Sequence, residues 1–117
     1  DNAIKNKQLK LFGYGKQSRD FINVKDVVDA YIKLGFSNRS GVFNVGSGKS
    51  TTIKELANMI IKKASKGRIK KLPALEGDAK FSCANINKIK SAINYSPKIS
   101  LDEGLDNLFK RKLWKKF

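Results

Sequence analysis

The sequence predicts a small α/β domain in which short strands alternate with three to four helices. The chain has 117 residues, enough for one compact domain with a modest core, and 40% of them are hydrophobic, which argues against disorder. Strand-like alternation of apolar and polar side chains gives way repeatedly to helical spacing. Apolar runs are far shorter than the roughly 20 residues of a membrane span, and the N-terminal stretch lacks the apolar segment of a signal peptide. We therefore expect a cytoplasmic protein.

The first half of the chain contains two extended segments followed by a helix. Residues 8–15 alternate apolar and polar side chains and reach a pair of glycines, which predicts a short strand and a turn. Residues 19–24, RDFINV, form the second extended segment. Residues 25–35 then place apolar side chains at helical spacing, and Gly35 is expected to end this helix.

The middle of the chain predicts a strand, a glycine turn and a helix. Residues 42–45, VFNV, are expected to form a short buried strand. Residues 52–64 place apolar side chains on one face of a helix. Thr52 and Glu55 have the spacing of a capping box, in which each side chain bonds the backbone N–H of the other residue.

Two further helices are expected toward the C-terminus. Residues 85–93 hold isoleucines on one side of a helix that Asn85 can cap. The last helix is expected to begin at Ser100, with Glu103 as its capping-box partner, and to continue through apolar side chains as far as Phe109.

The residue types that are missing narrow the chemistry. The chain has no histidine, which removes the commonest general base and the commonest metal ligand. Cys83 is the only cysteine, so no intrachain disulfide is possible, and the carboxylates are scattered. These features argue against a self-contained hydrolase or a metalloenzyme, and we expect no metal site.

The net charge of +15 has two interpretations: a basic face for a polyanion, or lysine on solvated surfaces. Only four of the basic residues are arginine. Base recognition and bidentate phosphate binding favour arginine, so the excess of lysine argues against nucleic-acid binding. We expect that solvated surface accounts for most of the charge.

The segment GVFNVGSGKST, residues 41–51, looks at first like a phosphate-binding loop. A Walker loop needs a glycine five positions before its Gly-Lys pair, and Phe43 stands there. The dinucleotide fingerprint also fails, because its third small residue is missing. We therefore expect a tight turn at Gly46 and Gly48, with Lys49 in solvent.

Taken together, several segments resemble one family, the nucleotide-sugar epimerases and dehydratases of the extended short-chain dehydrogenase superfamily, which includes UDP-glucose 4-epimerase. GYGKQSRDFINVKDVVDAYI (13–32) is similar to a run late in these sequences, with a Gly-x-Gly-x-Gln turn followed by Arg-Asp-Phe-Ile-x-Val. GVFNVGSGKSTTIKELA (41–57) and EGDAKFSCANINKIKSAINYSPKISLDEGL (76–105) resemble the next pieces. The pieces keep the family order from about Leu9 to Leu105.

The resemblance implies that residues 1–117 are a substrate-binding domain, the C-terminal part of a longer enzyme. Family members carry an N-terminal half with a glycine-rich turn for NAD and a catalytic Tyr-x-x-x-Lys. This sequence has neither feature. The dinucleotide fingerprint fails, as described above, and no tyrosine is followed by lysine four places later. The resemblance therefore implies an excised domain or a truncated gene that is not catalytic alone. The resemblance implies that the intact enzyme is a UDP-sugar 4-epimerase that binds NAD in its N-terminal half and forms a homodimer.

The resemblance also implies a set of substrate-binding residues for a nucleotide sugar. Arg19 matches an arginine that contacts the diphosphate. The alternative role for Arg19 is an ion pair with a surface carboxylate. Lys10, Leu11 and Phe12 match a segment that lines the base pocket, although Leu11 and Phe12 could equally be core. Asp78 matches an acidic residue near the ribose or phosphates. The alternative is that Asp78 only caps a helix or forms a turn.

Two neighbouring positions complete this site. Asp20 matches an aspartate with a mainly structural part, bonding nearby backbone. Leu75 stands where many members have arginine as a second phosphate clamp. Either one arginine suffices, or a cation of the preceding segment compensates; the candidates are Arg68, Lys70 and Lys71.

The C-terminal segment FKRKLWKKF, residues 109–117, supports a rival interpretation. It interleaves aromatic and cationic side chains, a pattern found at membrane interfaces and nucleic-acid surfaces. The alternative function is thus a small Lys-rich module that binds a polyanion. An ordinary amphipathic helix end explains the same pattern.

Overall fold

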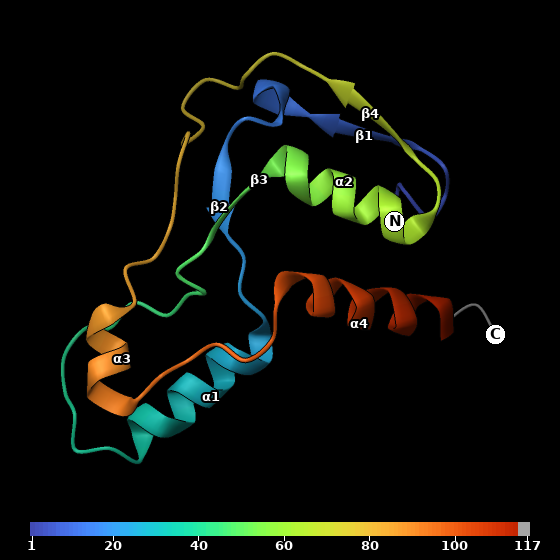
Figure 1. Ribbon diagram of the computed structural model, residues 1–117. Coiled ribbons are helices and arrows are strands. Elements are labelled where there is room, and N and C mark those ends of the chain that lie inside the picture. Colours follow the sequence, from blue (N-terminus) through green and yellow to red (C-terminus); the bar gives the residue numbers. More distant parts are fainter. Residues whose placement is uncertain (115–117) are drawn as a thin grey trace.

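The structure is a computed structural model that describes the backbone of residues 1–114 and the side chains of residues 1–111. Its regular elements follow one another along the chain as drawn in Figure 1: β1 (Gln8–Leu11), the 3-10 helix η1 (Phe12–Gly15), β2 (Ser18–Asp20), α1 (Val24–Gly35), β3 (Ser50–Thr52), α2 (Ile53–Ala64), β4 (Arg68–Lys71), α3 (Asn87–Ile93) and α4 (Leu101–Trp114). This confirms the expected mixed α/β class with short strands and four α-helices.

The strands form two separate two-stranded sheets. β1 runs parallel to β4, with Lys10 opposite Lys70, and β2 runs antiparallel to β3, with Arg19 opposite Thr51. The sequence did not indicate β3 or β4. Both are short and mostly polar, and each is defined by pairing with a strand far away in the chain rather than by its own pattern.

The strand expected at residues 42–45 does not form, and that prediction is wrong for the described chain. None of the strands in residues 1–114 pairs with this segment. Its Val42 carbonyl instead accepts a hydrogen bond from the Lys88 ammonium at 2.8 Å. Phe43 and Val45 still pack against the core, so the predicted burial is partly correct. The segment makes no β-ladder with another strand of the described residues.

The predicted helix boundaries agree with local capping. α1 ends at Gly35 as expected, and it begins one residue early because Asn23 accepts from the Lys25 N–H at 3.0 Å. The capping box of α2 is confirmed: Glu55 N–H donates to Thr52 Oγ1 at 3.1 Å, and Thr52 N–H donates to Glu55 Oε2 at 2.7 Å.

The last two helices meet the predicted caps only in part. The N-cap of α3 is Ile86, which makes no side-chain capping bond. The predicted cap Asn85 lies one residue earlier, where its Oδ1 accepts from the Asn87 N–H at 3.1 Å. Ser100 Oγ accepts from the Glu103 N–H at 3.2 Å at the start of α4, which is one half of the predicted capping box.

One buried cluster of the core lies between α1 and α3, and the other buried apolar residues are Ala3, Leu11, Ala57 and Leu105. The cluster contains Ala30, Ile86, Ile89 and Tyr95. The Tyr95 hydroxyl donates to the Gly46 carbonyl at 3.0 Å, which fixes the glycine turn against this cluster.

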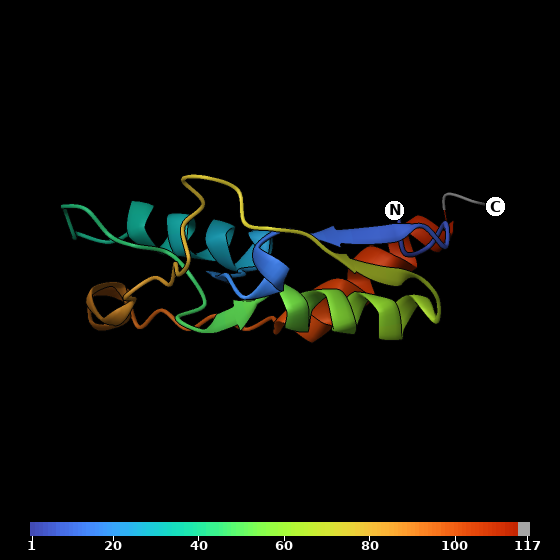
Figure 2. The same ribbon diagram turned by 90° about the horizontal axis from the view of Figure 1, so that it is seen from above.

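The molecule is thinner and more open than a compact domain. Its principal extents are 49 × 41 × 17 Å, and Figure 2 shows the helices and strands spread within this thin slab. The Cα radius of gyration is 16.8 Å. A compact chain of this length would have about 13 Å. The expectation of a compact domain is therefore not met by these residues alone.

Candidate functional site

The glycine turn after β1 brings two polar side chains to the start of β2. Gly13 and Gly15 have φ values of 58° and 74°, which favour glycine. A Cβ at Gly15 would lie 2.8 Å from Leu11 Cδ2, so this position also needs the space. The turn delivers Gln17 and Arg19 to one edge of the molecule.

That edge is bonded to a segment far away in the chain. The Ser18 N–H donates to the Lys80 carbonyl at 3.0 Å, and the Ser82 N–H donates to the Ser18 carbonyl at 3.2 Å. These two bonds hold residues 78–82 alongside β2. Side chains that the sequence separates by about 60 positions therefore become neighbours.

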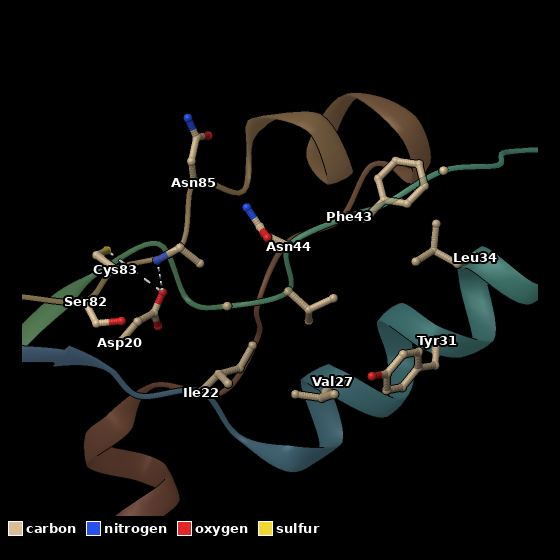
Figure 3. A pocket seen from close by; sticks show the side chains of 14 residues that line it. Asp20, Ile22, Val27, Tyr31, Leu34, Phe43, Asn44, Ser82, Cys83 and Asn85 are labelled. Carbon is tan, nitrogen blue, oxygen red and sulfur yellow. Dashed lines mark hydrogen bonds between the residues drawn. The ribbon is translucent and has the colours of Figure 1, made fainter. Parts of the chain in front are cut away.

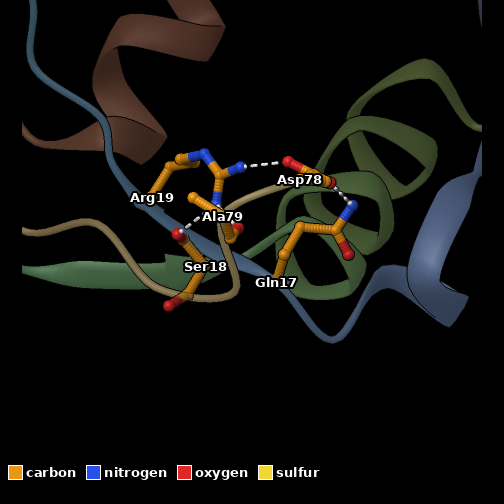
Figure 4. A network of polar contacts seen from close by, with 5 residues as sticks. All are labelled: Gln17, Ser18, Arg19, Asp78 and Ala79. Atoms are coloured by element: carbon orange, nitrogen blue, oxygen red, sulfur yellow. Dashed lines mark hydrogen bonds and ion pairs between the residues drawn. The ribbon is translucent and has the colours of Figure 1, made fainter. Parts of the chain in front are cut away.

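Arg19 and Asp78 form an ion pair at this junction (Figure 4). Arg19 Nη2 donates to Asp78 Oδ1 at 2.6 Å, and Nη1 donates to the carbonyls of Ala79 at 2.7 Å and Ser18 at 2.9 Å. The Arg19 and Asp78 side chains are 29% and 31% exposed. The structure thus brings together two of the predicted site residues, in the ion-pair geometry that was the alternative for Arg19.

Arg19 retains donors for a further partner. A guanidinium carries five N–H groups. The hydrogen bonds within the described residues use three of them, two on Nη1 and one on Nη2. The Nε–H and the second Nη2–H remain, and these two donors suit one oxyanion.

A pocket of about 630 Å³ lies next to this ion pair and is called the Gln17 pocket below. Gln17 Nε2 donates to Asp78 Oδ2 at 3.3 Å, so both Asp78 oxygens are bonded from the β1–β2 side (Figure 4). Gln17 Oε1 is buried and has no partner among the described residues. The residues that line the pocket are Gly13, Tyr14, Lys16, Gln17, Ala74, Leu75, Gly77, Asp78 and Lys80.

Asp20 has the structural role that the resemblance implied, because it bonds nearby backbone. Its Oδ1 accepts from the Ser47 N–H at 2.8 Å and from the Ser47 hydroxyl, and its Oδ2 accepts from the N–H groups of Gly48 at 2.9 Å and Ala84 at 3.2 Å. Burial alone would raise the pKa of Asp20, but these hydrogen bonds outweigh it and hold the pKa below its ordinary value. Asp20 thereby ties β2 to the turn at Gly46 and Gly48.

A second and larger cleft, of about 720 Å³, lies beside α1. Figure 3 shows Val27, Tyr31 and Leu34 of α1 on one side and Phe43 and Asn44 on another. None of the five predicted site residues, all of which the structure describes, lines this cleft. Asp20 reaches its edge, but its carboxylate already accepts from backbone N–H groups and the Ser47 hydroxyl, as described above.

The remaining predicted site residues lie on or next to β1. Leu11 is only 3% exposed and belongs to the core, which was its structural alternative. Lys10 is exposed on β1, and Phe12 in η1 is 36% exposed. Leu75 is exposed and lines the Gln17 pocket.

Lys16, Gln17 and Lys80 were not among the predicted site residues, although all three line the pocket. A signal existed for Gln17, because it completes the Gly-x-Gly-x-Gln turn. Lys16 and Lys80 are two of many lysines, and only the bonding of Ser18 to Lys80 brings their segments together.

Within residues 1–114, no group of three or more His, Cys, Asp and Glu side chains is gathered as a metal site requires, and no helix is long and apolar enough to cross a membrane. Lys49 is exposed, as expected. The aromatic and cationic pattern of residues 109–117 lies mostly outside the side chains that the structure describes, so its interpretation stays a prediction.

Comparison with known proteins identifies the family. The family model of GDP-mannose 4,6 dehydratase matches residues 2–108. This chain belongs to the NAD-dependent epimerase/dehydratase family. The resemblance inferred from the sequence motifs is therefore confirmed.

Relatives in this epimerase/dehydratase family act on UDP-sugars by name. The chain is 33% identical over 105 residues to UDP-glucuronic acid decarboxylase 1 of Danio rerio, covering 89% of this chain and 25% of the relative. It is 34% identical over 107 residues to UDP-glucuronate 4-epimerase of Thermodesulfobacterium geofontis, covering 85% and 31%. Its fold matches UDP-glucuronic acid 4-epimerase from Bacillus cereus, solved with UDP-glucuronic acid and NAD, with a TM-score of 0.81 and 28% identity, covering 88% of this chain and 34% of that one.

The chain thus spans between a quarter and a third of the length of these epimerase/dehydratase relatives. The matching region is a partial domain of their fold, which agrees with the open shape of the described residues.

Proposed function

We propose that this chain is the substrate-binding part of an NAD-dependent nucleotide-sugar epimerase or dehydratase, and more specifically of a UDP-sugar 4-epimerase. It would hold the sugar nucleotide by its diphosphate. The observation that carries this proposal is the junction of β2 with residues 78–82, where Arg19 has two unused donors and pairs with Asp78. Asp78 lines the Gln17 pocket, and Arg19 itself is not among the lining residues. A nucleotide-sugar diphosphate offers oxyanions that match such donors.

The relatives support the substrate class. The two sequence relatives described above are named for UDP-glucuronic acid or UDP-glucuronate, and the similar structure was solved with UDP-glucuronic acid. They include both a decarboxylase and 4-epimerases, so the choice of a 4-epimerase is the more specific part of the proposal.

NAD is assigned to a separate N-terminal half. The residues of this chain do not fit that cofactor, because the sequence has no glycine-rich cofactor turn and no Tyr-x-x-x-Lys. The contribution of this chain would be positioning, since holding the nucleotide fixes where the sugar lies relative to the reacting groups.

Exposed apolar side chains support the existence of such a partner half. Phe36 is 92% exposed and Val42 is 84% exposed, and Val28, Tyr31 and Ile32 on α1 are also exposed. Patches of this kind mark surfaces that pack against another domain. The unpaired segment at residues 42–45 lies in the same region and would gain a neighbouring strand there.

Calorimetry with UDP-glucose and UDP-glucuronic acid tests the proposal. Arg19→Ala should weaken binding at least tenfold, because a hydrogen bond to a charged group is worth about 1.5–3 kcal/mol. Arg39→Ala is the matched control, since Arg39 is an exposed arginine outside both pockets, and it should bind like the wild type. Equal affinity of the Arg19 and Arg39 variants would remove Arg19 from the site.

A further inference from the structure

We infer that Lys16 and Lys80 are the additional cationic anchors of the diphosphate in the Gln17 pocket, taking the place of a second arginine. This inference rests on the proposed function. It assigns a binding role to two residues that the sequence motifs do not single out.

The two lysines face one pocket from two separate segments. Lys16 follows η1, and its N–H donates to the Gly13 carbonyl at 3.1 Å. Lys80 lies opposite β2, where its carbonyl accepts from the Ser18 N–H at 3.0 Å. Both backbones are therefore fixed, while both side chains are exposed and line the pocket.

The charges around the pocket are unbalanced. Asp78 is the only carboxylate that lines it, and both its oxygens are already bonded, by Arg19 and Gln17. Within residues 1–114, neither Lys16 nor Lys80 is in an ion pair. Two unpaired ammonium groups at one pocket repel each other and attract an anion.

The resulting charge matches the proposed ligand. Arg19, Lys16 and Lys80 contribute three positive charges, and Asp78 removes one, which leaves about +2 at neutral pH. The diphosphate of a nucleotide sugar carries two negative charges. Gln17 Oε1 at the same place is buried and has no partner among the described residues.

The cations considered from the sequence alone lie elsewhere. Arg68, Lys70 and Lys71 are on β4, which pairs with β1, and none of them lines the Gln17 pocket. Leu75 does line it and is exposed, so an arginine at this position would face the same space as Lys16 and Lys80.

Calorimetric titration of the chain with UDP, and with uridine as the uncharged comparison, tests the inference. Lys16→Met and Lys80→Met, singly and together, retain much of the side-chain length without the charge. Each should raise the Kd for UDP about 2- to 5-fold, and the pair about 5- to 25-fold, because exposed charge pairs are individually weak. Binding of uridine should change less than twofold. The salt dependence of UDP binding should also become shallower in the double variant.

Two further variants make the test specific. Lys66→Met with Lys90→Met removes two exposed lysines outside the pocket and should leave UDP binding unchanged. Leu75→Arg, added to the Lys16 and Lys80 double variant, should restore most of the UDP affinity. Matching circular dichroism spectra establish that each variant is folded.

The outcomes separate this inference from the proposed function. If the double variant binds UDP like the wild type while Arg19→Ala loses affinity, the lysine assignment is overturned and the proposed function stands. If the wild type does not bind UDP, or the Arg19 variant binds it equally well, both are overturned. An equal loss in the Lys66 and Lys90 control would also overturn the inference, because it would show that only total charge matters.

Discussion

Replacing Asp20 with asparagine should destabilise the chain markedly, because this carboxylate accepts from four N–H and O–H donors, with the Cys83 thiol as a weaker fifth donor at 4.0 Å. Its Oδ1 accepts from the N–H and hydroxyl of Ser47, and its Oδ2 accepts from the N–H groups of Gly48 and Ala84. An amide has only one oxygen. In the better orientation its NH2 group faces Ser47, whose hydroxyl can turn to accept, but the Ser47 N–H is left without a partner.

The magnitude follows from this arrangement. An unpaired N–H in a partly buried site costs about 1–3 kcal/mol. The bonds to Gly48 and Ala84 remain but lose their charge assistance, which removes roughly another 1 kcal/mol. Asp20→Asn should therefore lower the free energy of unfolding by about 2–4 kcal/mol, a large part of the about 5–15 kcal/mol that a typical domain has.

Urea unfolding followed by circular dichroism measures this loss. Asp102→Asn is the control, because Asp102 is 63% exposed and pairs with Lys63 at the surface. Its loss should stay below about 1 kcal/mol. A similar small loss in both variants would refute the proposed role of Asp20.

The pH dependence provides a second check on Asp20. Its pKa is lowered in the folded chain, so its ionised form stabilises the fold above the unfolded pKa of about 3.9. That stabilisation is lost as the pH falls through the lower folded value. The difference between wild type and Asp20→Asn should be constant from pH 5 to 7 and shrink below pH 4. A difference that does not depend on pH would contradict this explanation.

Three further predictions concern a cap, the core and the exposed surface. Thr52→Ala should lower the free energy of unfolding by about 1 kcal/mol in urea, and Thr52→Ser should restore most of it; equal stability of the two variants would contradict the capping box. Tyr95→Phe should cost about 1–2 kcal/mol by leaving the Gly46 carbonyl unbonded, and a neutral effect would show that this bond contributes nothing. Phe36→Ser with Val42→Ser should change stability by less than about 1 kcal/mol and reduce self-association in sedimentation velocity; unchanged association would argue against a docking surface there.

The parts of the fold that the sequence predicted are those with local causes. The start of α2 follows from Thr52 and Glu55, three residues apart, and the end of α1 follows from Gly35. β4 and the failed strand at residues 42–45 depend on partners elsewhere. RIKK becomes a strand because β1 lies beside it, and VFNV does not because no described strand does.

The same distinction applies to the candidate site. Arg19 was identified because the Gly-x-Gly-x-Gln-x-Arg motif is contiguous in the sequence. Its contact with Asp78 joins residues 59 positions apart, and no spacing rule reveals it. Lys16 and Lys80 were missed for the same reason, since among many lysines only the backbone bonds of Ser18 distinguish Lys80.

A crystal structure of this chain with UDP-glucuronic acid would test the central claim most directly. We predict that a diphosphate oxygen lies about 2.7–3.2 Å from the Arg19 guanidinium, at the edge of the Gln17 pocket. A nucleotide bound away from β2 and residues 78–82, with Arg19 contacting only Asp78 and backbone carbonyls, would contradict it.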